Sequence, residues 1–336
     1  WVPVALVEEV AEPDGTPVEA RVFGEDLVVW RDSEGRVGVM DRRCPHRRAS
    51  LAYGRNEDGG LRCLYHGWKF DVHGRVLEMS SEPGASGLAD KVEHLAYPVE
   101  EWGGFVWAWM GPKGEAPPFA PPPFAPSADT RVSIAKVVLP CNWAQVLEGA
   151  IDSAHSSSLH SSDMVPAKID GAKATSTMWY RPSTDKAPRL QVQRTPYGFR
   201  YAALRRPIVD SASNEYVRLT VFVAPFTVLI PPNDLYNVAN VNVPVDDTTT
   251  LFLFIAWGEE AATVPDTESW RKFLGQQVGI DLDAEYRPLR NLGNRFWQDR
   301  AAMKAGNFTG IKGFPNQDIA MWVTMGPIAD RTHERL

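Results

Sequence analysis

The amino-acid sequence predicts an α+β protein of two domains, a small all-β domain followed by a larger domain that mixes strands and helices. Three observations support this prediction. The chain has 336 residues, more than one average domain needs. Its first third holds short strand-like runs separated by turn residues, whereas its remainder holds longer strand patterns and helical patterns. A proline-rich run lies between the two parts.

The first predicted domain covers residues 1–111. Alternating apolar residues bounded by glycine, serine and acidic residues are typical of short strands joined by tight turns. Such runs occur at residues 18–23, 26–31, 37–40 and 103–109. We therefore expect a small all-β domain whose chemistry lies in its loops.

Two short motifs in this domain each pair one cysteine with one histidine. Cys44-Pro45-His46 and Cys63-Leu64-Tyr65-His66 are sixteen residues apart. Two thiolates and two imidazoles fit a Rieske [2Fe-2S] cluster, in which cysteines hold one iron and histidines hold the other. Structural zinc accepts the same donors, but zinc fingers usually group their cysteines apart from their histidines. The mixed pairs favour the Rieske cluster, which transfers electrons one at a time.

The overall composition is that of an ordinary globular protein, with 44% hydrophobic and 23% charged residues. A net charge of −7 argues against a nucleic-acid partner, and no apolar run approaches the ~20 residues that span a bilayer. Only three cysteines are present, and Cys141 has no mate outside the motifs, which favours a reducing cytoplasm. Because the first residue is Trp1 and not Met, the sequence is compatible with trimmed ends.

Residues 112–126 form the predicted linker, because their proline density disfavours helix and central strand and favours an extended connector. The second predicted domain covers residues 127–336.

The second domain opens with a helical pattern at residues 142–160 that carries acidic residues and two histidines. Glu148, Asp152 and His155 would share one helical face. His160 lies five residues beyond His155, a step of about 500° on a regular helix, so we expect the helix to end or bulge at the serines between them. Both rings could then bind one metal. Such pairs also occur without a metal, but an electron-transfer cluster on the same chain needs an acceptor.

A carboxylate would complete the facial triad of a non-haem iron oxygenase. The late candidates are Asp299, Asp318, Asp330 and Glu334. Asp299 and Asp330 each lie beside an arginine and have an expected surface partner. Asp318 leads into the apolar run 319–323, where a buried carboxylate is costly unless a cation compensates it. Asp318 is therefore the predicted third ligand, and a helix N-cap is the alternative.

Taken together, these motifs resemble the catalytic α subunits of Rieske non-haem iron aromatic-ring oxygenases. The resemblance rests on Cys-x-His…Cys-x-x-His, on Asn-Trp-x-Gln-x-x-Glu-Gly-x-x-Asp-x-x-His-x₄-His at residues 142–160, and on Gln-Asp at 317–318. Residues 181–189 and 316–330 further resemble the members that act on phthalate. The resemblance implies a helix-grip catalytic domain behind the Rieske domain.

The resemblance also implies a role for each motif residue. Cys44, His46, Cys63 and His66 would hold the cluster, and His155, His160 and Asp318 would hold the mononuclear iron. Asp152 would bridge electron transfer from His66 of a neighbouring subunit, because the two centres of one chain lie too far apart in such proteins. A homotrimer, or stacked trimers, would be the working unit.

The implied activity is cis-dihydroxylation of an aromatic ring with O₂. The electrons would come from NADH through a separate reductase that carries flavin and an iron–sulfur centre, since this chain has no Gly-x-Gly-x-x-Gly signature.

A phthalate-like dianion needs cations inside an apolar pocket, and arginine meets a carboxylate with two parallel hydrogen bonds. Arg218 lies on the mostly apolar face of a strand predicted at 216–225, and Arg181 follows the aromatic run 178–180. We predict that these two arginines bind the substrate carboxylates. Structural salt bridges are the alternative for each. The rival residues in the neighbouring hairpin are Arg194, Arg200, Arg205 and Arg206.

Three hypotheses follow from the sequence. The first is a dioxygenase that acts on phthalate or a close aromatic carboxylate. The second is a monooxygenase or O-demethylase of the same family that acts on a substituted benzoate. The third is an electron carrier alone, which would need only the first domain.

Overall fold

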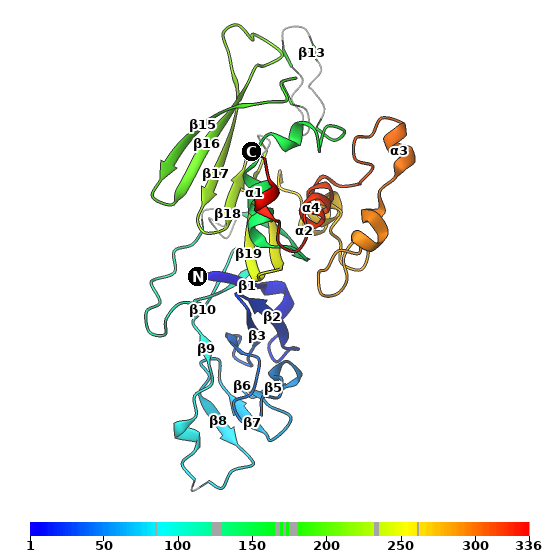
Figure 1. Ribbon diagram of the computed structural model, residues 1–336. Coiled ribbons are helices and arrows are strands. Elements are labelled where there is room, and N and C mark those ends of the chain that lie inside the picture. The colour runs from blue at the N-terminus through cyan, green and yellow to red at the C-terminus, as the bar shows by residue number, and fades with distance from the viewer. Residues whose placement is uncertain are drawn as a thin grey trace. The chain divides into compact units, whose positions relative to one another are not determined.

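The computed structural model describes residues 1–84, 86–122, 130–164, 169–170, 173–174, 181–231, 235–260 and 262–335. The chain divides into two compact units, Trp1–Ala125 and Pro126–Leu336. Figure 1 shows the first unit mostly in blue and cyan and the second in green to red. Each unit is described by itself.

In its described part, the first unit consists of three antiparallel sheets and short 3₁₀ helices. The three-stranded sheet has the order β1 (Val2–Leu6), β11 (Phe105–Ala108), β10 (Val99–Trp102). One four-stranded sheet has the order β2 (Val18–Val22), β3 (Glu25–Arg31), β4 (Val37–Asp41), β9 (Ala96–Tyr97). The other has the order β5 (Arg55–Glu57), β6 (Gly60–Arg62), β7 (Trp68–Phe70), β8 (Val76–Met79). The 3₁₀ helices are η1 (Val7–Val10), η2 (Leu51–Tyr53) and η3 (Ala89–Lys91).

The strands predicted at 18–23, 26–31, 37–40 and 103–109 correspond to β2, β3, β4 and β11. The last of them starts later than expected, because Gly103 and Gly104 form a turn with positive φ angles of 63° and 85°. Both motif cysteines belong to the apolar core of this unit, together with Trp30, Met40 and Phe70. The loops that carry the motifs therefore rest on buried side chains.

A seven-stranded antiparallel sheet forms the frame of the second unit. Its first and last strands in the sequence, β12 and β20, are neighbours and pair over nine residues. The order is β12 (Arg131–Leu139), β20 (Thr249–Gly258), β19 (Asn237–Asp246), β18 (Thr227–Ile230), β17 (Tyr216–Val223), β16 (Gly198–Arg205), β15 (Arg189–Thr195). A separate two-stranded ribbon joins β13 (Ile169–Asp170) and β14 (Lys173–Ala174).

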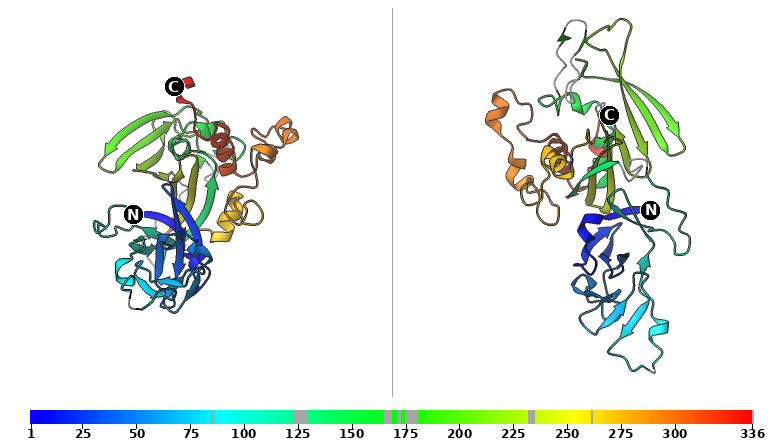
Figure 2. Two further views of the ribbon diagram at one scale, coloured as in Figure 1. Left: turned by 60° about the horizontal axis from the view of Figure 1, so that its bottom comes forward. Right: turned by 180° about the vertical axis from the view of Figure 1, so that it is seen from behind.

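Helices pack on one face of this sheet. Trp270 of α2 and Trp322 of α4 belong to one apolar core with Phe252 and Phe254 of β20. In Figure 2 the orange and red helices lie to one side of the green and yellow strands in both views. The helices are α1 (Trp143–Ile151), α2 (Thr267–Leu274), α3 (Arg300–Lys304) and α4 (Phe314–Thr324), with the 3₁₀ helices η4 (His155–Ser157), η5 (Leu292–Trp297) and η6 (Arg331–His333).

The predicted α+β class is confirmed, with a small all-β unit followed by an antiparallel sheet plus helices. Residues 112–122 of the predicted linker contain neither helix nor strand, and residues 123–126 lie outside the described residues. Among the residues that the structure describes, no helix is long and apolar enough to cross a bilayer.

Candidate functional site

The two Cys–His motifs occupy two loops of the first unit. The first loop follows β4 and precedes η2, and the second joins β6 to β7. Each cysteine begins a tight turn, because the carbonyl of Cys44 accepts the N–H of Arg48 and the carbonyl of Cys63 accepts the N–H of Gly67. Gly67 has a φ of 74°, and a Cβ there would come within 3.1 Å of Ser80, so this turn favours glycine.

The four predicted ligands of the cluster come together in this unit. Cys44 and Cys63 are 1% and 2% exposed. The ring centroids of His46 and His66 are 4.3 Å apart, and the His46 ring stacks on Trp68 at 4.6 Å with an interplanar angle of 7°. The pair of buried sulfurs and the pair of adjacent rings match the donor set of a Rieske cluster.

Two properties of these donors indicate that a metal centre is needed here. Burial raises the pKa of the Cys44 thiol to about 11, so a thiolate at this position needs a compensating cation. The Nδ1 atom of His46 is buried and has no hydrogen-bond partner among the residues that the structure describes. A buried polar atom without a partner costs free energy, which coordination to iron would remove.

The second candidate centre lies where α1 ends. We expected Asp152 and His155 to continue its helical face, and this expectation is wrong. The helix ends at Ile151, and Asp152 is its C-cap in an extended conformation, with φ −85° and ψ 122°. The Asp152 carboxylate instead accepts the backbone N–H groups of Ala154 and His155, which starts η4. Glu148 faces elsewhere and pairs with Arg331.

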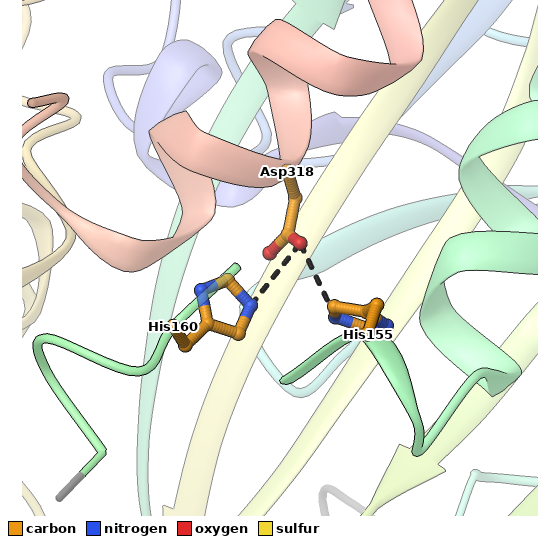
Figure 3. Close-up of side chains that lie close together, drawn as sticks. All are labelled: His155, His160 and Asp318. Atoms are coloured by element: carbon orange, nitrogen blue, oxygen red, sulfur yellow. Dashed lines mark ion pairs between the residues drawn. The ribbon is translucent and has the colours of Figure 1, made fainter. Parts of the chain in front are cut away.

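The early end of α1 brings three predicted iron ligands together. Nε2 of His155 lies 3.3 Å from Oδ1 of Asp318, and Nε2 of His160 lies 3.2 Å from the same oxygen. Figure 3 shows the rings of His155 and His160, which belong to one loop, pointing at the carboxylate of Asp318, which projects from α4. Suitable donor atoms of all three residues lie within 4.8 Å of one another, so one ion could bind all of them.

Asp318 is an interior residue of α4, so the N-cap alternative is wrong. The N-cap of this helix is Gly313. The rival carboxylates have other roles. Asp299 caps α3 by accepting the N–H of Ala302, and Asp330 caps η6 by accepting the N–H of Thr332. Glu334 forms an ion pair with Arg331.

The charges of this triad depend on one another. Burial lowers the pKa of His155, but the carboxylates of Asp152 and Asp318 outweigh it and raise that pKa to about 9. Burial acts against ionisation of Asp318, but His160 and His155 more than offset it and lower the pKa of this carboxyl. The mutual stabilisation shows that a buried carboxylate here depends on nearby positive charge, which a ferrous ion would supply.

Three arginines line the same cavity as the triad. Arg181 donates to the hydroxyls of Ser157 at 2.8 Å and Ser156 at 2.9 Å. Arg218 leaves β17 on the inward face and donates to the hydroxyl of Tyr216 at 3.0 Å. The aromatic run 178–180 that precedes Arg181 lies outside the described residues.

The third arginine, Arg205 of β16, was only one of several rivals in the sequence. It is 3% exposed, and its Nη2 donates to the carbonyl of Ser153 at 2.8 Å. Its Nε and Nη1 are buried and have no hydrogen-bond partner in the described part of the chain. The strand register could have identified it. Ala203 pairs with Arg218, and Arg205 lies two residues after Ala203 on the same strand, so Arg205 and Arg218 share one face of the sheet.

The other rival arginines lie away from this cavity. Arg200 donates to Gln193, and the backbone N–H of Arg206 donates to Asp185. Arg194 lies on the exposed edge strand β15.

The cavity opens to solvent on one side, and the empty space within it and in its mouth, open solvent included, is about 720 Å³. Its walls combine the triad and the three arginines with apolar and aromatic side chains, among them Phe252, Phe254 and Phe314. Burial and the neighbouring guanidinium groups of Arg205 and Arg218 lower the pKa of Arg181 to about 10. Among the described residues, none of the three guanidinium groups forms an ion pair with a carboxylate. An apolar cavity with unpaired cations favours an anionic aromatic ligand.

Comparison with known families decides between the possible metal centres. Residues 1–91 match the family model of the Rieske [2Fe-2S] domain. Residues 108–336 match the model described as LigXa C-terminal domain like. The chain belongs to the Rieske non-haem iron oxygenases. The structural-zinc alternative and the electron-carrier alternative are therefore wrong.

Curated relatives agree with this family. The chain is 74% identical, over all of its 336 residues and 76% of the relative, to the phthalate 4,5-dioxygenase oxygenase subunit of Pseudomonas putida. It is 35% identical to the 3-chlorobenzoate-3,4-dioxygenase oxygenase subunit of Comamonas testosteroni, over all of this chain and 79% of that one. It is 31% identical to the 5,5'-dehydrodivanillate O-demethylase oxygenase subunit of a Sphingobium species, over all of this chain and 70% of that one.

Solved structures show the same fold at low identity. Dicamba monooxygenase bound to dicamba matches with a TM-score of 0.62 at 20% identity, over 83% of each chain. The terminal oxygenase of carbazole 1,9a-dioxygenase from Novosphingobium sp. KA1 has the same TM-score and identity, over 97% of this chain and 84% of that one.

As a Rieske non-haem iron oxygenase, the protein uses a [2Fe-2S] cluster and a mononuclear iron as cofactors and works as one component of a multicomponent system. The donor sets in both units fit these groups. The assignment of individual residues as ligands stays a prediction.

Proposed function

We propose that this chain is the oxygenase component of a phthalate 4,5-dioxygenase, which adds both atoms of O₂ to adjacent carbons of phthalate. The observation that carries this proposal is a set of three arginines, one buried and two half-buried, that line the cavity of the iron triad and form no ion pair with a carboxylate among the described residues. The relative at 74% identity is an oxygenase subunit of a phthalate 4,5-dioxygenase, which supports the same substrate.

In this proposal, Arg181 and Arg218 bind the two carboxylates of phthalate. Each guanidinium can offer a pair of parallel N–H donors to one carboxylate. Arg205 adds a third charge to the same cavity, and its Nε and Nη1, which have no hydrogen-bond partner among the described residues, belong to a side chain on the same face of the sheet as Arg218. A dianion would remove the mutual repulsion of the three groups, whereas a neutral arene would not.

Binding through the carboxylates also determines which ring edge reacts. The carboxylates occupy C1 and C2 of the ring, and the edge farthest from them is C4–C5. A substrate held by the arginines would therefore turn C4 and C5 toward His155, His160 and Asp318. This orientation is the contribution that the protein makes to regiochemistry.

The proposed cluster ligands are Cys44, His46, Cys63 and His66, and the proposed iron ligands are His155, His160 and Asp318. When bound, the cluster supplies electrons singly and the ferrous ion supplies the oxidative chemistry of a two-histidine, one-carboxylate centre. The chain's own side chains hold these groups, orient the substrate and keep the reacting edge in an apolar cavity.

Asp152 is the proposed bridge for electron transfer. Its Oδ2 lies 3.2 Å from Nδ1 of His155, although the alignment does not make a hydrogen bond, and its side chain is 45% exposed. It can therefore contact His155 and a group from outside the unit at once. In the proposed homotrimer, that group is His66 of a neighbouring subunit.

The electrons would come from NADH through a partner reductase with flavin and an iron–sulfur centre. The balanced reaction takes one phthalate, one O₂, one NADH and one proton to the cis-4,5-dihydrodiol and NAD⁺. Both oxygen atoms stay in the product. In O-demethylation, by contrast, one oxygen atom leaves as water.

The alternative is an O-demethylase or monooxygenase that acts on a substituted benzoate, as the name of the 31% identical relative suggests for that protein. A monocarboxylate would leave at least one of Arg181 and Arg218 without an anion. The arginine set therefore favours the dicarboxylate.

The deciding experiment combines oxygen uptake with product analysis. The protein, loaded with both metal centres, is assayed with NADH, a generic reductase and ¹⁸O₂ on phthalate, benzoate and a methoxybenzoate. We expect turnover on phthalate and a dihydrodiol that carries two labelled oxygen atoms. Product with one labelled atom, or faster turnover of the methoxybenzoate, would refute the dioxygenase assignment.

A further inference from the structure

We infer that Gln317 is a positioning residue for the mononuclear iron, because it fixes the tautomer and the ring orientation of His160 and is itself held by Asp163 and the carbonyl of Ile311. This inference rests on the proposed role of His160 as an iron ligand.

The contacts of Gln317 use both ends of its side-chain amide. The residue lies in α4 directly before Asp318 and is 1% exposed. Its Oε1 lies 2.8 Å from Nδ1 of His160. Its Nε2 donates to Oδ2 of Asp163 at 2.7 Å and to the carbonyl of Ile311 at 2.9 Å.

These contacts leave one orientation for the amide. A carboxylate and a carbonyl can only accept hydrogen bonds, so the NH₂ end of Gln317 must face Asp163 and Ile311. The oxygen end then faces His160, and because an amide oxygen only accepts, Nδ1 of His160 must carry the proton. A neutral imidazole carries one N–H, so Nε2 keeps its lone pair.

That lone pair is on the atom that the iron site needs. Nε2 of His160 is the nitrogen 3.2 Å from Oδ1 of Asp318. The same turn of α4 thus supplies one ligand, Asp318, and the group that orients another. Metal-bound histidines usually donate their second N–H to an acceptor that sets the tautomer, and loss of such an acceptor typically weakens metal binding about 10- to 100-fold.

The other histidine of the triad lacks this support. Nδ1 of His155 is buried and has no hydrogen-bond partner among the described residues, and its nearest carboxylate, that of Asp152, is poorly aligned. Of the two imidazoles, His160 is therefore the one whose orientation is set before the metal binds.

The test compares iron affinity in two leucine variants. Gln317→Leu keeps the volume of the side chain and removes the acceptor, so the dissociation constant for Fe²⁺ should rise about 10- to 100-fold in anaerobic chelator competition. The visible spectrum of the Rieske cluster in the same sample serves as the internal control and should not change.

Gln145→Leu is the matched control. Gln145 is 2% exposed and also makes three hydrogen bonds, to the carbonyls of Trp322 and Gly326 and from the N–H of Ala329. It contacts none of the three proposed ligands. Both variants should lose thermal stability, and only Gln317→Leu should lose iron. Equal iron loss in both variants, or wild-type affinity in Gln317→Leu, overturns the inference.

A measurement on the unmodified protein covers the case in which Gln317→Leu does not fold. With Zn²⁺ in the mononuclear site and ¹⁵N-labelled histidine, His160 should appear as the Nδ1–H tautomer bound through Nε2. Binding through Nδ1 overturns the inference. His160→Ala separates the two proposals. If this variant still binds iron, the assignment of His160 as a ligand is wrong. If it loses iron while Gln317→Leu keeps wild-type iron affinity, only the positioning role of Gln317 is wrong.

Discussion

Arg181, Arg205 and Arg218 bring three positive charges to one cavity. At most surface positions such charges are hydrated or paired and contribute little, but here burial already lowers the pKa of Arg181 and of Arg205. Both guanidinium groups still keep their charge at neutral pH, and a buried charge without a counter-ion is costly. In the proposed function, the anionic substrate supplies that counter-ion.

We expect Arg218→Ala to raise KM for phthalate by roughly 10- to 100-fold, because a charge-assisted hydrogen bond is lost and each 1.4 kcal/mol is a factor of ten. KM for benzoate should change much less. Steady-state oxygen uptake measures both constants, and iron analysis should show both centres loaded.

Arg189→Ala is the control for this prediction. Arg189 lies on β15 of the same sheet, is 65% exposed in its side chain and pairs with Glu215. Removal of the Arg189 side chain should leave KM for phthalate unchanged. An unchanged KM in Arg218→Ala would mean that the carboxylates bind elsewhere.

Candidate metal ligands could be proposed from the sequence because metals accept few donor types at restricted spacings. Gln317 could not, because its contact with His160 joins residues 157 positions apart and an amide has many possible roles. A related reason explains why Arg205 could not be distinguished from the other arginines by sequence. Its role depends on strand register, and a charged residue within a strand is usually exposed.

At the scale of elements, α1 packs against α4, and the proposed iron ligands lie just after α1 and on α4. Gly149 lies inside α1, where glycine normally costs about 1 kcal/mol relative to alanine. A Cβ at this position would lie 2.1 Å from Nε1 of Trp322 on α4. The glycine therefore allows the two helices to approach closely.

We predict that Gly149→Ala destabilises the second unit despite the better helix propensity of alanine. The Trp322 ring is 5% exposed and packs edge-on against Phe252 at 5.8 Å, so it cannot move away easily. The melting temperature should fall, and iron occupancy should fall with it. Adding Trp322→Leu to Gly149→Ala should recover part of the lost melting temperature. A melting temperature of Gly149→Ala above that of the wild type would contradict the prediction.

The predicted end of the first helix was wrong by about one turn. Helical periodicity runs through Asp152 to His155, but Asp152 stops the helix and caps the next turn with its carboxylate. Aspartate and serine compete with the helix for backbone hydrogen bonds, and periodicity does not register that competition.

A pH effect should come from the segment that follows η3. His94 is 3% exposed, its Nε2 lies 2.7 Å from the carbonyl of Asp41 at the end of β4, and burial lowers its pKa. The unfolded chain therefore binds a proton at this residue more readily than the folded one. Stability should fall as the pH drops below about 6.5 toward the folded pKa.

Urea unfolding at about pH 7.5 and about pH 5.5, followed by the absorbance of the cluster, measures this effect. His94→Gln keeps a donor for the Asp41 carbonyl and removes the titration. The free energy of unfolding of this variant should differ less between the two pH values than that of the wild type. An equal difference would show that other groups cause the acid sensitivity.

At the scale of the whole molecule, the two proposed metal centres differ in their donors. Two buried cysteine sulfurs would hold the cluster, whereas the mononuclear site has no sulfur donor and one of its ligands, His155, is 26% exposed in its side chain and borders a cavity with an open mouth. The mononuclear iron should therefore leave more easily than the cluster.

We predict that a mild chelator abolishes oxygen uptake while the visible absorbance of the cluster persists. The iron content should fall from about three to about two atoms per chain, and added Fe²⁺ should restore activity. The reductase should still reduce the cluster in the chelated protein. Bleaching of the cluster at the same rate as activity loss would contradict the prediction.

The sequence allowed prediction of the two-part architecture but not of the sheet order. Local alternation identifies strands such as β2, β3 and β17, because it depends only on which face is buried. The pairing of β12 with β20 joins the first strand of the second unit to a strand more than a hundred residues later. Such long-range pairing is determined by packing against α2 and α4, which local patterns do not contain.

The hydrogen bonds from Arg181 to Ser156 and Ser157 have a thermodynamic consequence. Both serines belong to the loop between His155 and His160, so one guanidinium contacts the loop that is proposed to hold the iron and the substrate that is proposed to react. If an anion on Arg181 favours one geometry of that loop, it changes the affinity for the metal. Reciprocity then requires the metal to change the affinity for the anion by the same factor.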